Sequence, residues 1–350
     1  MLSTRRVWID LAILSVSAAI TVAAADYLFH FVAPPKHLRE VEDGVRDLRQ
    51  GNPTALIVGS SHARTFQAVG QELSRRTGGA ENLVAVPIEY GKLFAYDSLL
   101  QRHLLPIVDQ PDASGAVAKN RLRRFVLVTE WWDSCGHGDG KPYWNLPARA
   151  WEVGDFAKDL LQKGINGYNR NYLQNRFRML FPESALVYDR TQRVILPTLA
   201  RVLRGKPLRP TADEELRLVE EWQRMVEGGA ACIGDPVQMA SLRDTLGLAR
   251  SRQWETTVIL FPRKPATLTE TAKSTTLAVF ARQVRAMAEP LGATVIDLTY
   301  RSPLTDADFM DDFDHVTEEG NVKFARWVLD HDLKFLLAPL AAAGLERAGR

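Results

Sequence analysis

Three side chains of this sequence have types and spacing that fit acyl-transfer chemistry. Ser61 lies in "VGSSHA", directly after the apolar run Thr54 to Val58, and Asp312 and His315 lie three residues apart in "DDFDHV". In a tight turn, that spacing lets the carboxylate reach the histidine ring, fix its tautomer and stabilise the imidazolium. A serine is a weak nucleophile until such a base lies beside it. Taken together, the two motifs predict Ser61 as nucleophile, His315 as base and Asp312 as its orienting carboxylate.

Each motif also has a simpler interpretation. A serine between a strand and a helix is commonly a cap whose hydroxyl binds free helix amides. His315 in a solvated loop, with Asp312 and Asp314 capping the next helix or binding calcium, is the corresponding alternative for the second motif. The acidic run "DADFMDDFD" lacks the spaced ligands and the glycine of a calcium loop.

The elements that must position these residues form an alternating pattern of short apolar runs and helical segments. The expected strands are Thr54 to Val58, Asn82 to Ile88, Arg124 to Glu130, Thr256 to Pro262 and Ala293 to Thr299. Such runs with helices between them predict an α/β doubly wound domain with a five-stranded parallel sheet. In the strand order 2-1-3-4-5, ligands collect at the carboxyl ends of the strands beside strand one, where Ser61 would lie. A histidine after the last strand returns to the same edge.

The alternation breaks once, which divides the chain into segments. Residues 51–139 and 254–337 are expected to form the sheet domain, and residues 140–253 a mainly helical insertion. Cys135 and Cys232 lie at the proposed site edge and at the end of the insertion's long helix. A disulfide between them would hold the insertion over the pocket, and two free thiols are the alternative.

The N-terminus has the features of a membrane segment. Arg5 and Arg6 precede an apolar stretch from Leu11 to Ala25, followed by "YLFHFVA" and two prolines. Residues 1–33 are therefore expected to form a transmembrane signal anchor, with 34–50 as a charged juxtamembrane helix or linker. A signal peptide cleaved after Ala23 to Ala25 is the alternative. Both place the remaining chain outside the cytoplasm, and the preferred localisation is the inner membrane with a periplasmic domain.

Composition excludes several function classes. The formal charge of +2 and the absence of a basic block with interleaved aromatic residues give no indication of nucleic-acid binding. Neither a CxxC pair nor an HExxH motif is present, so no metal and no other cofactor is predicted.

The combination of "VGSSHA" near the start and "DFDH" near the end resembles the SGNH (GDSL-like) hydrolase superfamily. With the apolar N-terminus, it is most similar to the membrane-anchored branch that acylates cell envelopes, namely alginate O-acetyltransferase-like proteins and the teichoic acid D-alanylation protein. The resemblance covers about Leu56 to Trp327, the insertion excepted. It implies a flavodoxin-like SGNH fold and an acyl-Ser61 intermediate, formed through a tetrahedral oxyanion that the amides of Ser61 and Gly91 would bind.

The chain departs from the family pattern at two places. Ser60 stands where many members have aspartate, and "TEWWDSCGHG" replaces the family's Gly-x-Asn segment after strand three. The third oxyanion donor is therefore unassigned.

Five further residues are candidates for contact with substrate. His62 adjoins the nucleophile and is expected to have a supporting role. Trp131 and Trp132 follow strand three and would form a sugar-stacking platform, with core packing as the alternative. Glu130 and Asp133 lie near the same strand end, where solvation is the alternative to substrate contact.

The expected function is a membrane-anchored extracytoplasmic serine acyltransferase that O-acetylates a cell-envelope or secreted polysaccharide. Its expected partners are the polysaccharide acceptor, the membrane through the N-terminal helix, and a multispan membrane-bound O-acyltransferase that supplies the acyl group. Two rivals remain open. One is an SGNH carbohydrate esterase that uses water as acceptor, and the other is a non-catalytic polysaccharide-binding or assembly subunit.

Overall fold

The computed structural model describes most of the chain after residue 35, with two large gaps. Described are residues 36–51, 53–88, 91–109, 122–136 and 212–337, with a few positions between 13 and 24 and between 154 and 161. The chain divides into two compact units, Glu40–Asp139 with Pro210–Arg350, and Met1–Arg39 with Gly140–Arg209. All elements of the sheet and the candidate site belong to the first of these.

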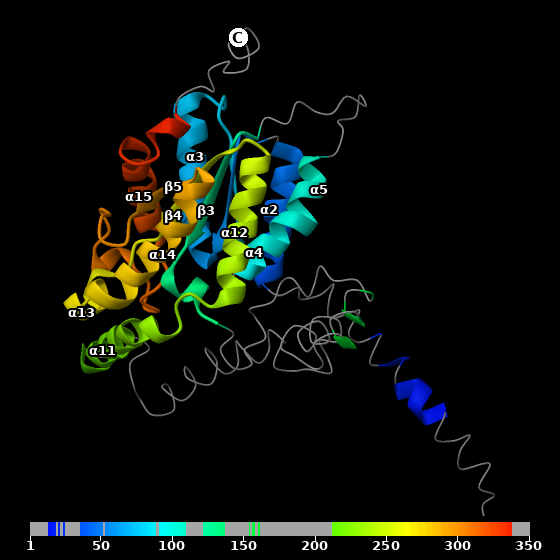
Figure 1. Cartoon of the computed structure of the whole chain (residues 1–350), viewed down its shortest axis with the longest axis horizontal. Coiled ribbons are helices and arrows are strands. Elements are labelled where there is room, and N and C mark those ends of the chain that lie inside the picture. Colours follow the sequence, from blue (N-terminus) through cyan, green and yellow to red (C-terminus); the bar gives the residue numbers. More distant parts are fainter. Residues whose placement is uncertain are drawn as a thin grey trace, which may run out of the picture. The chain divides into compact units, whose positions relative to one another are not determined.

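A five-stranded sheet forms the centre of this unit (Figure 1). Its strands are β1 (Ala55–Ser60), β2 (Leu83–Ile88), β3 (Arg124–Thr129), β4 (Glu255–Leu260) and β5 (Thr294–Asp297). Every pairing is parallel and the order is β2-β1-β3-β4-β5. The predicted α/β class, the parallel sheet and the strand order are confirmed.

The first four runs became strands because they are almost continuously apolar and are covered on both faces. Every residue of β1, β2 and β3 is buried, and only the first residue of β4 is exposed. β5 lies at the edge of the sheet and is partly exposed along its whole length. This distribution is that of a parallel sheet between two helical layers.

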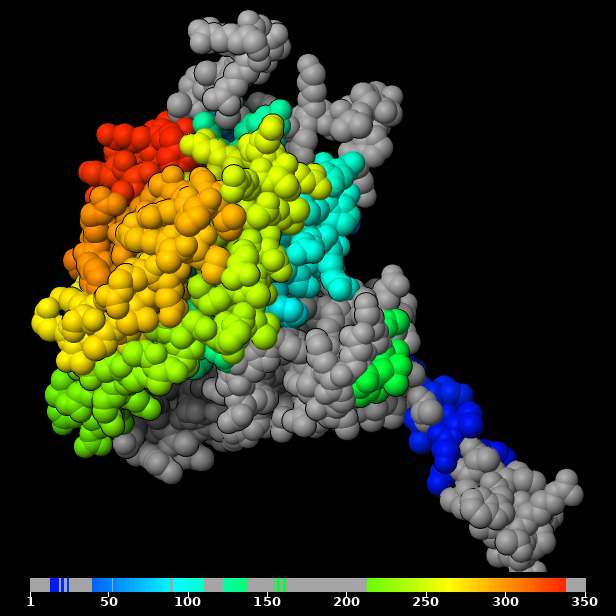
Figure 2. Space-filling view, in the orientation of Figure 1, coloured from blue at the N-terminus to red at the C-terminus, as the bar shows by residue number. Residues whose placement is uncertain are grey.

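Helices cover both faces of the sheet (Figure 1). The described helices are α2 (Lys36–Gly51), α3 (Thr65–Thr77), α4 (Leu93–Leu99), α5 (Leu105–Val108), α11 (Ala212–Gly228), α12 (Pro236–Ser251), α13 (Glu270–Ala272), α14 (Ala278–Ala288) and α15 (Glu318–Asp330). α3 and α15 pack against each other on one face. α12 packs against α4 and α14 on the other, and Figure 2 shows α12 in yellow-green and α14 in yellow to orange.

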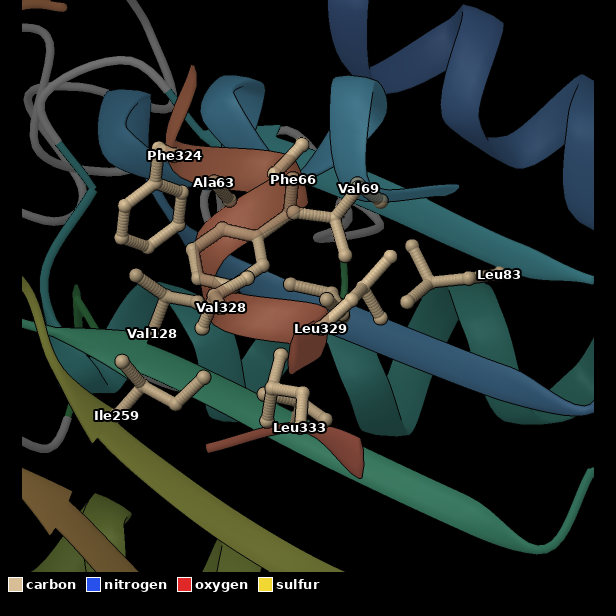
Figure 3. Close-up of a cluster of buried hydrophobic side chains, with 14 of the residues drawn as sticks. Ala63, Phe66, Val69, Leu83, Val128, Ile259, Phe324, Val328, Leu329 and Leu333 are labelled. Atoms are coloured by element: carbon tan, nitrogen blue, oxygen red, sulfur yellow. The ribbon is translucent and has the colours of Figure 1, made fainter. Parts of the chain in front are cut away.

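The core on the α3/α15 face is built around aromatic and branched side chains. Phe66 of α3 meets Phe324 of α15 edge-on, with ring centroids 5.6 Å apart. Both rings are fully buried and lie among Val128 and Ile259 from the sheet (Figure 3). This packing fixes α3 and α15 on the same face, and therefore fixes the loops that precede them.

The helix that follows the motif of Asp312 and His315 begins at a defined cap. α15 begins after Thr317, whose hydroxyl accepts a hydrogen bond from the N–H of Gly320 at 3.1 Å. A Cβ at Gly320 would lie 2.6 Å from Val316 Cγ1, so the loop before α15 approaches the helix too closely for a larger residue. The start of α15 is thus fixed within a few residues of Asp312 and His315.

The predicted insertion is only partly described. Residues 137–211 lie outside the described residues apart from a few positions, and α11 and α12 lie in the same compact unit as the sheet. α12 packs against β4 and α4, so it serves as the helix of the crossover from β3 to β4. The sheet unit therefore resumes at Pro210, well before the predicted boundary at residue 254.

A disulfide joins Cys135 to Cys232 across a sequence separation of 97 residues. Cys135 ends the 3-10 turn Trp131–Ser134 that follows β3, and Cys232 follows α11. The predicted pairing is present, and it fixes the segment between α11 and α12 to the edge of the sheet where β3 ends.

The predicted anchor, residues 1–33, falls mostly outside the described residues. Within the part of the chain that is described, no helix has both the length and the apolar character needed to cross a bilayer. The predicted charged linker is helical, since α2 runs from Lys36 to Gly51.

Candidate active site

Ser61 lies at the carboxyl end of β1, in the turn that leads into α3. β1 ends at Ser60, and a 3-10 turn, Ser61–Arg64, connects it to α3. The preceding Gly59 is required by packing, because a Cβ there would overlap the carbonyl oxygen of Val128 in β3. The glycine of "GSS" thus lets β1 approach β3, and the turn follows at the edge where ligands gather in such sheets.

The two serines of the motif have different partners. The hydroxyl oxygen of Ser60 caps the turn by accepting a hydrogen bond from the N–H of His62 at 3.4 Å, and it also lies 2.9 Å from His62 Nδ1. Ser61 instead directs its hydroxyl to His315. The helix-cap interpretation of this motif therefore applies to Ser60 and not to Ser61.

Ser61, His315 and Asp312 form a hydrogen-bonded chain. The Oγ atom of Ser61 lies 2.7 Å from His315 Nε2, and His315 Nδ1 lies 2.7 Å from Asp312 Oδ2. Because ionised Asp312 only accepts, the network assigns the ring proton to Nδ1 and leaves Nε2 to accept the serine proton. The order of these contacts is the one that a serine nucleophile, its base and an orienting carboxylate would need in acyl transfer.

The carboxylate of Asp312 is held by its own turn. Its Oδ1 accepts hydrogen bonds from the backbone N–H of His315 at 2.9 Å and of Asp314 at 3.1 Å. Burial alone would raise the pKa of Asp312, but the hydrogen bond and charge of His315 outweigh it and lower that pKa. Asp312 therefore stays ionised and can stabilise a protonated His315.

The turn that carries His315 contains a strained residue. Phe313 has a φ of +63°, which is unusual for a residue other than glycine. Its ring is buried, and Lys264 Nζ lies 3.8 Å from the ring centroid. Such a conformation costs roughly 1–3 kcal/mol and persists only where its surroundings enforce it.

A buried ionic cluster lies beside this chain and consists of His62, Glu130, Arg263 and Asp314. Arg263 Nη1 donates to Asp314 Oδ1 at 2.7 Å and forms an ion pair with Glu130 Oε2. His62 Nδ1 lies 3.6 Å from Glu130 Oε1, and His62 Nε2 lies 3.4 Å from Asp314 Oδ1. Two cations and two carboxylates therefore face each other in the interior.

The charges of the cluster shift the titration of its members. Burial by itself lowers the pKa of His62, but the carboxylates of Asp314 and Glu130 outweigh it and raise that pKa to about 9. In turn, the cations His62 and Arg263 outweigh the effect of burial on Asp314 and hold its pKa well below the usual range. His62 is therefore an imidazolium at neutral pH, which donates from both ring nitrogens.

The donor atoms of His62, Glu130 and Asp314 lie within 4.8 Å of one another, which is compatible with a metal site. Two features of the cluster oppose that interpretation. The two ring nitrogens of His62 each already face a carboxylate, Nδ1 that of Glu130 and Nε2 that of Asp314. Arg263 also already bridges the two carboxylates with its own charge. The arrangement is that of an ion-pair network.

The N–H of Gly91, the second predicted oxyanion donor, has a partner within the chain. The N–H of Gly91 donates to the carbonyl oxygen of Ile88 at 2.8 Å, so it is not directed to a ligand. Packing accounts for the glycine, since a Cβ would lie 2.6 Å from Tyr96 Cε1. The Tyr96 hydroxyl also donates to the carbonyl oxygen of Gly91.

The candidates that follow β3 are mostly buried. Trp131 is 2% exposed and packs against Gly229, so it belongs to the core and does not form a platform for sugars. Trp132 is half-buried, and Lys92 Nζ lies 5.0 Å from the centroid of its ring. It is the one of the pair with an accessible surface.

Glu130 and Asp133 are not solvated residues at a pocket rim. Glu130 belongs to the ionic cluster, and Asp133 is 1% exposed. Asp133 Oδ2 accepts hydrogen bonds from the Thr129 hydroxyl and the N–H of Glu130, both at 3.0 Å. Burial, with a contribution from Glu130, raises the pKa of Asp133. Both carboxylates hold the turn after β3 in place.

Sequence reasoning missed the role of Arg263 and of Asp314. Arg263 follows β4 in "FPRKP", at the same sheet edge as Ser61, and its charge at a buried strand end was the available signal. Asp314 lies inside the recognised "DFDH" motif and had no assigned partner. A comparison of the sequence with models of known protein families found no match, and neither did a comparison with curated protein sequences.

Proposed function

We propose that this protein is a serine acyltransferase of the SGNH type that works through an acyl-Ser61 intermediate. The observation that carries the proposal is the hydrogen-bonded chain from Ser61 through His315 to Asp312, with both links at 2.7 Å. The strand order and the location of Ser61 directly after β1 also agree with such a fold.

In the first half-reaction, the Oγ atom of Ser61 attacks the carbonyl carbon of an acyl donor while His315 Nε2 takes the hydroxyl proton. His315 then gives this proton to the departing group, so that the acyl group remains as an ester on Ser61. Asp312 stabilises the imidazolium between the two transfers. The amide of Ser61 is the first proposed oxyanion donor, and Gly91 could be the second only if its N–H left the carbonyl oxygen of Ile88.

In the second half-reaction, a hydroxyl group of the acceptor attacks the ester on Ser61. His315 takes the proton of that hydroxyl and returns a proton to Ser61, so the new ester leaves and the enzyme is regenerated. The proposed acceptor is a cell-envelope or secreted polysaccharide, and the proposed acyl group is acetyl. Both rest on the resemblance to the membrane-anchored branch.

We propose an extracytoplasmic location with a single N-terminal anchor in the inner membrane. The disulfide between Cys135 and Cys232 supports an oxidising compartment, since such bonds persist mainly outside the cytoplasm. A domain in that location has no direct access to cytoplasmic acyl thioesters. A multispan membrane-bound O-acyltransferase is therefore the proposed supplier of the acyl group.

Two alternatives remain as proposals. An esterase of the same fold would use the same three residues with water as acceptor. A non-catalytic polysaccharide-binding or assembly subunit is favoured by a different observation, namely that the N–H of Gly91 is bound to Ile88 and the Gly-x-Asn segment is missing. Such a protein would keep the hydrogen-bonded chain without forming an acyl-enzyme.

Covalent labelling followed by an acceptor assay separates these possibilities. The purified protein is treated with a fluorophosphonate, and the modified peptide is identified by mass spectrometry. Labelling at Ser61 is expected, and Ser241→Ala serves as control because Ser241 lies on α12 and bonds the carbonyl of Val237. An unlabelled Ser61 would support the binding subunit.

If Ser61 is labelled, protein that has not been treated with the inhibitor is assayed with an acetyl ester, in the presence and in the absence of an oligosaccharide acceptor. Transfer of acetyl to the sugar in excess over hydrolysis supports the transferase. Hydrolysis that the sugar does not divert supports the esterase.

A further inference from the structure

Two adjacent contacts join the turn of Ser61 to the turn of His315. Ser61 bonds His315, and the next residue, His62, contacts the preceding residue, Asp314. His62 Nε2 lies 3.2 Å from the backbone carbonyl oxygen of Asp314 and 3.4 Å from its carboxylate. The second contact therefore fixes the backbone of the turn at the residue before the proposed base.

Asp314 is also in contact with a residue that follows another strand. Arg263 follows β4 and donates to the carboxylate of Asp314 at 2.7 Å, while its pairing with Glu130 connects it to the end of β3. The guanidinium also lies 5.3 Å from the ring centroid of Trp222, which limits its orientation. The carboxyl ends of β1, β3 and β4 thus all converge on Asp314 through the ionic cluster.

The turn of His315 requires such external contacts. Phe313, between Asp312 and Asp314, holds a positive φ although it is not a glycine. The residue on each side of it is bound, Asp312 by the backbone of its own turn and Asp314 by the cluster. Strain of this kind is retained where the neighbouring structure over-determines the conformation.

The cluster is also an unfavourable means of stabilising a fold, because of the desolvation free energy of its charges. Burying four charges costs desolvation energy that apolar residues of similar size would avoid, so ion pairs in an interior are weak evidence of a purely stabilising role. His62 and Arg263 are 2% and 4% exposed, and both are charged. A requirement for one defined position of Asp314 explains why charged groups lie there.

We propose that the ionic cluster of His62, Glu130, Arg263 and Asp314 is a positioning device that holds His315 Nε2 against the hydroxyl of Ser61. Its members are positioning residues, because they act through the backbone of the 312–315 turn and do not touch the reacting atoms. The inference rests on the proposed function of Ser61. Loss of the cluster would let His315 move, and a displacement of about 1 Å at a reacting group can reduce a rate by about 100-fold.

The test uses the kinetics of fluorophosphonate labelling of the full-length protein. Asp314→Asn removes a carboxylate of the cluster with little change of volume, and His62→Gln removes a cation while retaining a donor. Arg263→Lys keeps the charge, whereas Arg263→Gln removes it. Asp330→Asn is the matched control. Asp330 is the last residue of α15, at the end away from the 312–315 turn, and it forms an ion pair with Arg76.

The measured quantities are the maximal rate constant of labelling, the inhibitor concentration at half-maximal rate and the final amplitude. The rate constant is a property of the folded protein, and the amplitude measures the fraction of the sample that is folded. We expect Asp314→Asn, His62→Gln and Arg263→Gln to lower the rate constant by about 10- to 100-fold with less than about twofold change in the half-maximal concentration. Arg263→Lys should recover most of the rate, and Asp330→Asn should match the wild type.

The outcomes separate the inference from the proposed function. A wild-type protein that is not labelled at Ser61 refutes the proposed function itself. Labelling of the wild type together with unchanged rate constants in the cluster variants overturns the inference alone. Loss of amplitude at an unchanged rate constant, or complete loss of amplitude, indicates a purely structural role and overturns it as well.

Discussion

The imidazole rings of His62 and His315 are stacked, with centroids 5.7 Å apart and 23° between their planes. The two rings have different partners. His62 Nδ1 lies 2.9 Å from the Ser60 hydroxyl oxygen and His62 Nε2 lies 3.2 Å from the Asp314 carbonyl oxygen, so neither nitrogen is directed to Ser61. His315 directs Nε2 to Ser61 and is therefore the base of the proposed reaction.

Substitution of the three proposed catalytic residues should remove activity without unfolding the protein. Ser61→Ala, His315→Gln and Asp312→Asn are each expected to lower acyl transfer by at least about a thousandfold, because the groups work as one unit. The double variant Ser61→Ala/His315→Gln should be no slower than Ser61→Ala. Steady-state assays with circular dichroism of each variant check this, and full activity of Ser61→Ala would refute the mechanism.

His62 should make the stability of the domain depend on pH in the alkaline range. Its pKa is raised from 6.5 to about 9, so its contribution is fully present below about pH 6.5 and is lost as pH rises through about 9. The groups that set this pKa are Asp314, Glu130 and Arg263. The loss amounts to about 3 kcal/mol.

Urea unfolding at a series of pH values measures this effect. The wild type should lose stability between about pH 7 and pH 10, and His62→Gln should flatten that part of the curve. An equally steep curve in His62→Gln would assign the pH dependence to other groups.

The disulfide should stabilise the sheet unit. The bond closes a loop across 97 residues, and the chain-entropy model predicts about 4–5 kcal/mol for a loop of that size. Thermal unfolding with and without reductant gives the measurement. The double variant Cys135→Ser/Cys232→Ser should match the reduced protein and should no longer respond to reductant.

Gly91→Ala should affect stability and leave the chemical step unchanged. The new Cβ would lie 2.6 Å from Tyr96 Cε1 and 2.8 Å from Ile88 Cβ, and overpacking of this kind costs about 1–3 kcal/mol. The rate constant of Ser61 labelling in the folded protein should equal that of the wild type. A large drop in that rate constant would show that the position of this loop affects the chemical step, since alanine keeps the backbone N–H.

The sequence carried enough information for the sheet because the inner strands are short, buried and almost entirely apolar. Val58 and Val126 lie in runs of this kind, and the helices between the runs imply parallel strands. The crossover helix α12 was harder to assign, because it follows a long segment and its role depends on contacts with α4 and β4. Amphipathic patterning indicates that a helix is covered, but it does not identify the covering element.

The same contrast applies to the candidate site. Asp312 and His315 were recognisable because a local spacing of three residues determines their contact. Arg263 and Asp314 are 51 residues apart, and no local pattern connects them. The close packing of Gly91 against Tyr96 is likewise a contact that no local pattern indicates.

The contact of Ser61 with His315 spans 254 residues of sequence, which has a consequence for how the site is assembled during synthesis. Contacts between such distant residues form late, because the entropy of closing the intervening chain must be overcome first. A chain that emerges with its N-terminus first cannot complete the site until α15 has followed and packed on α3. The hydroxyl of Ser61 therefore meets the ring of His315 only after all five strands of the sheet have been synthesised.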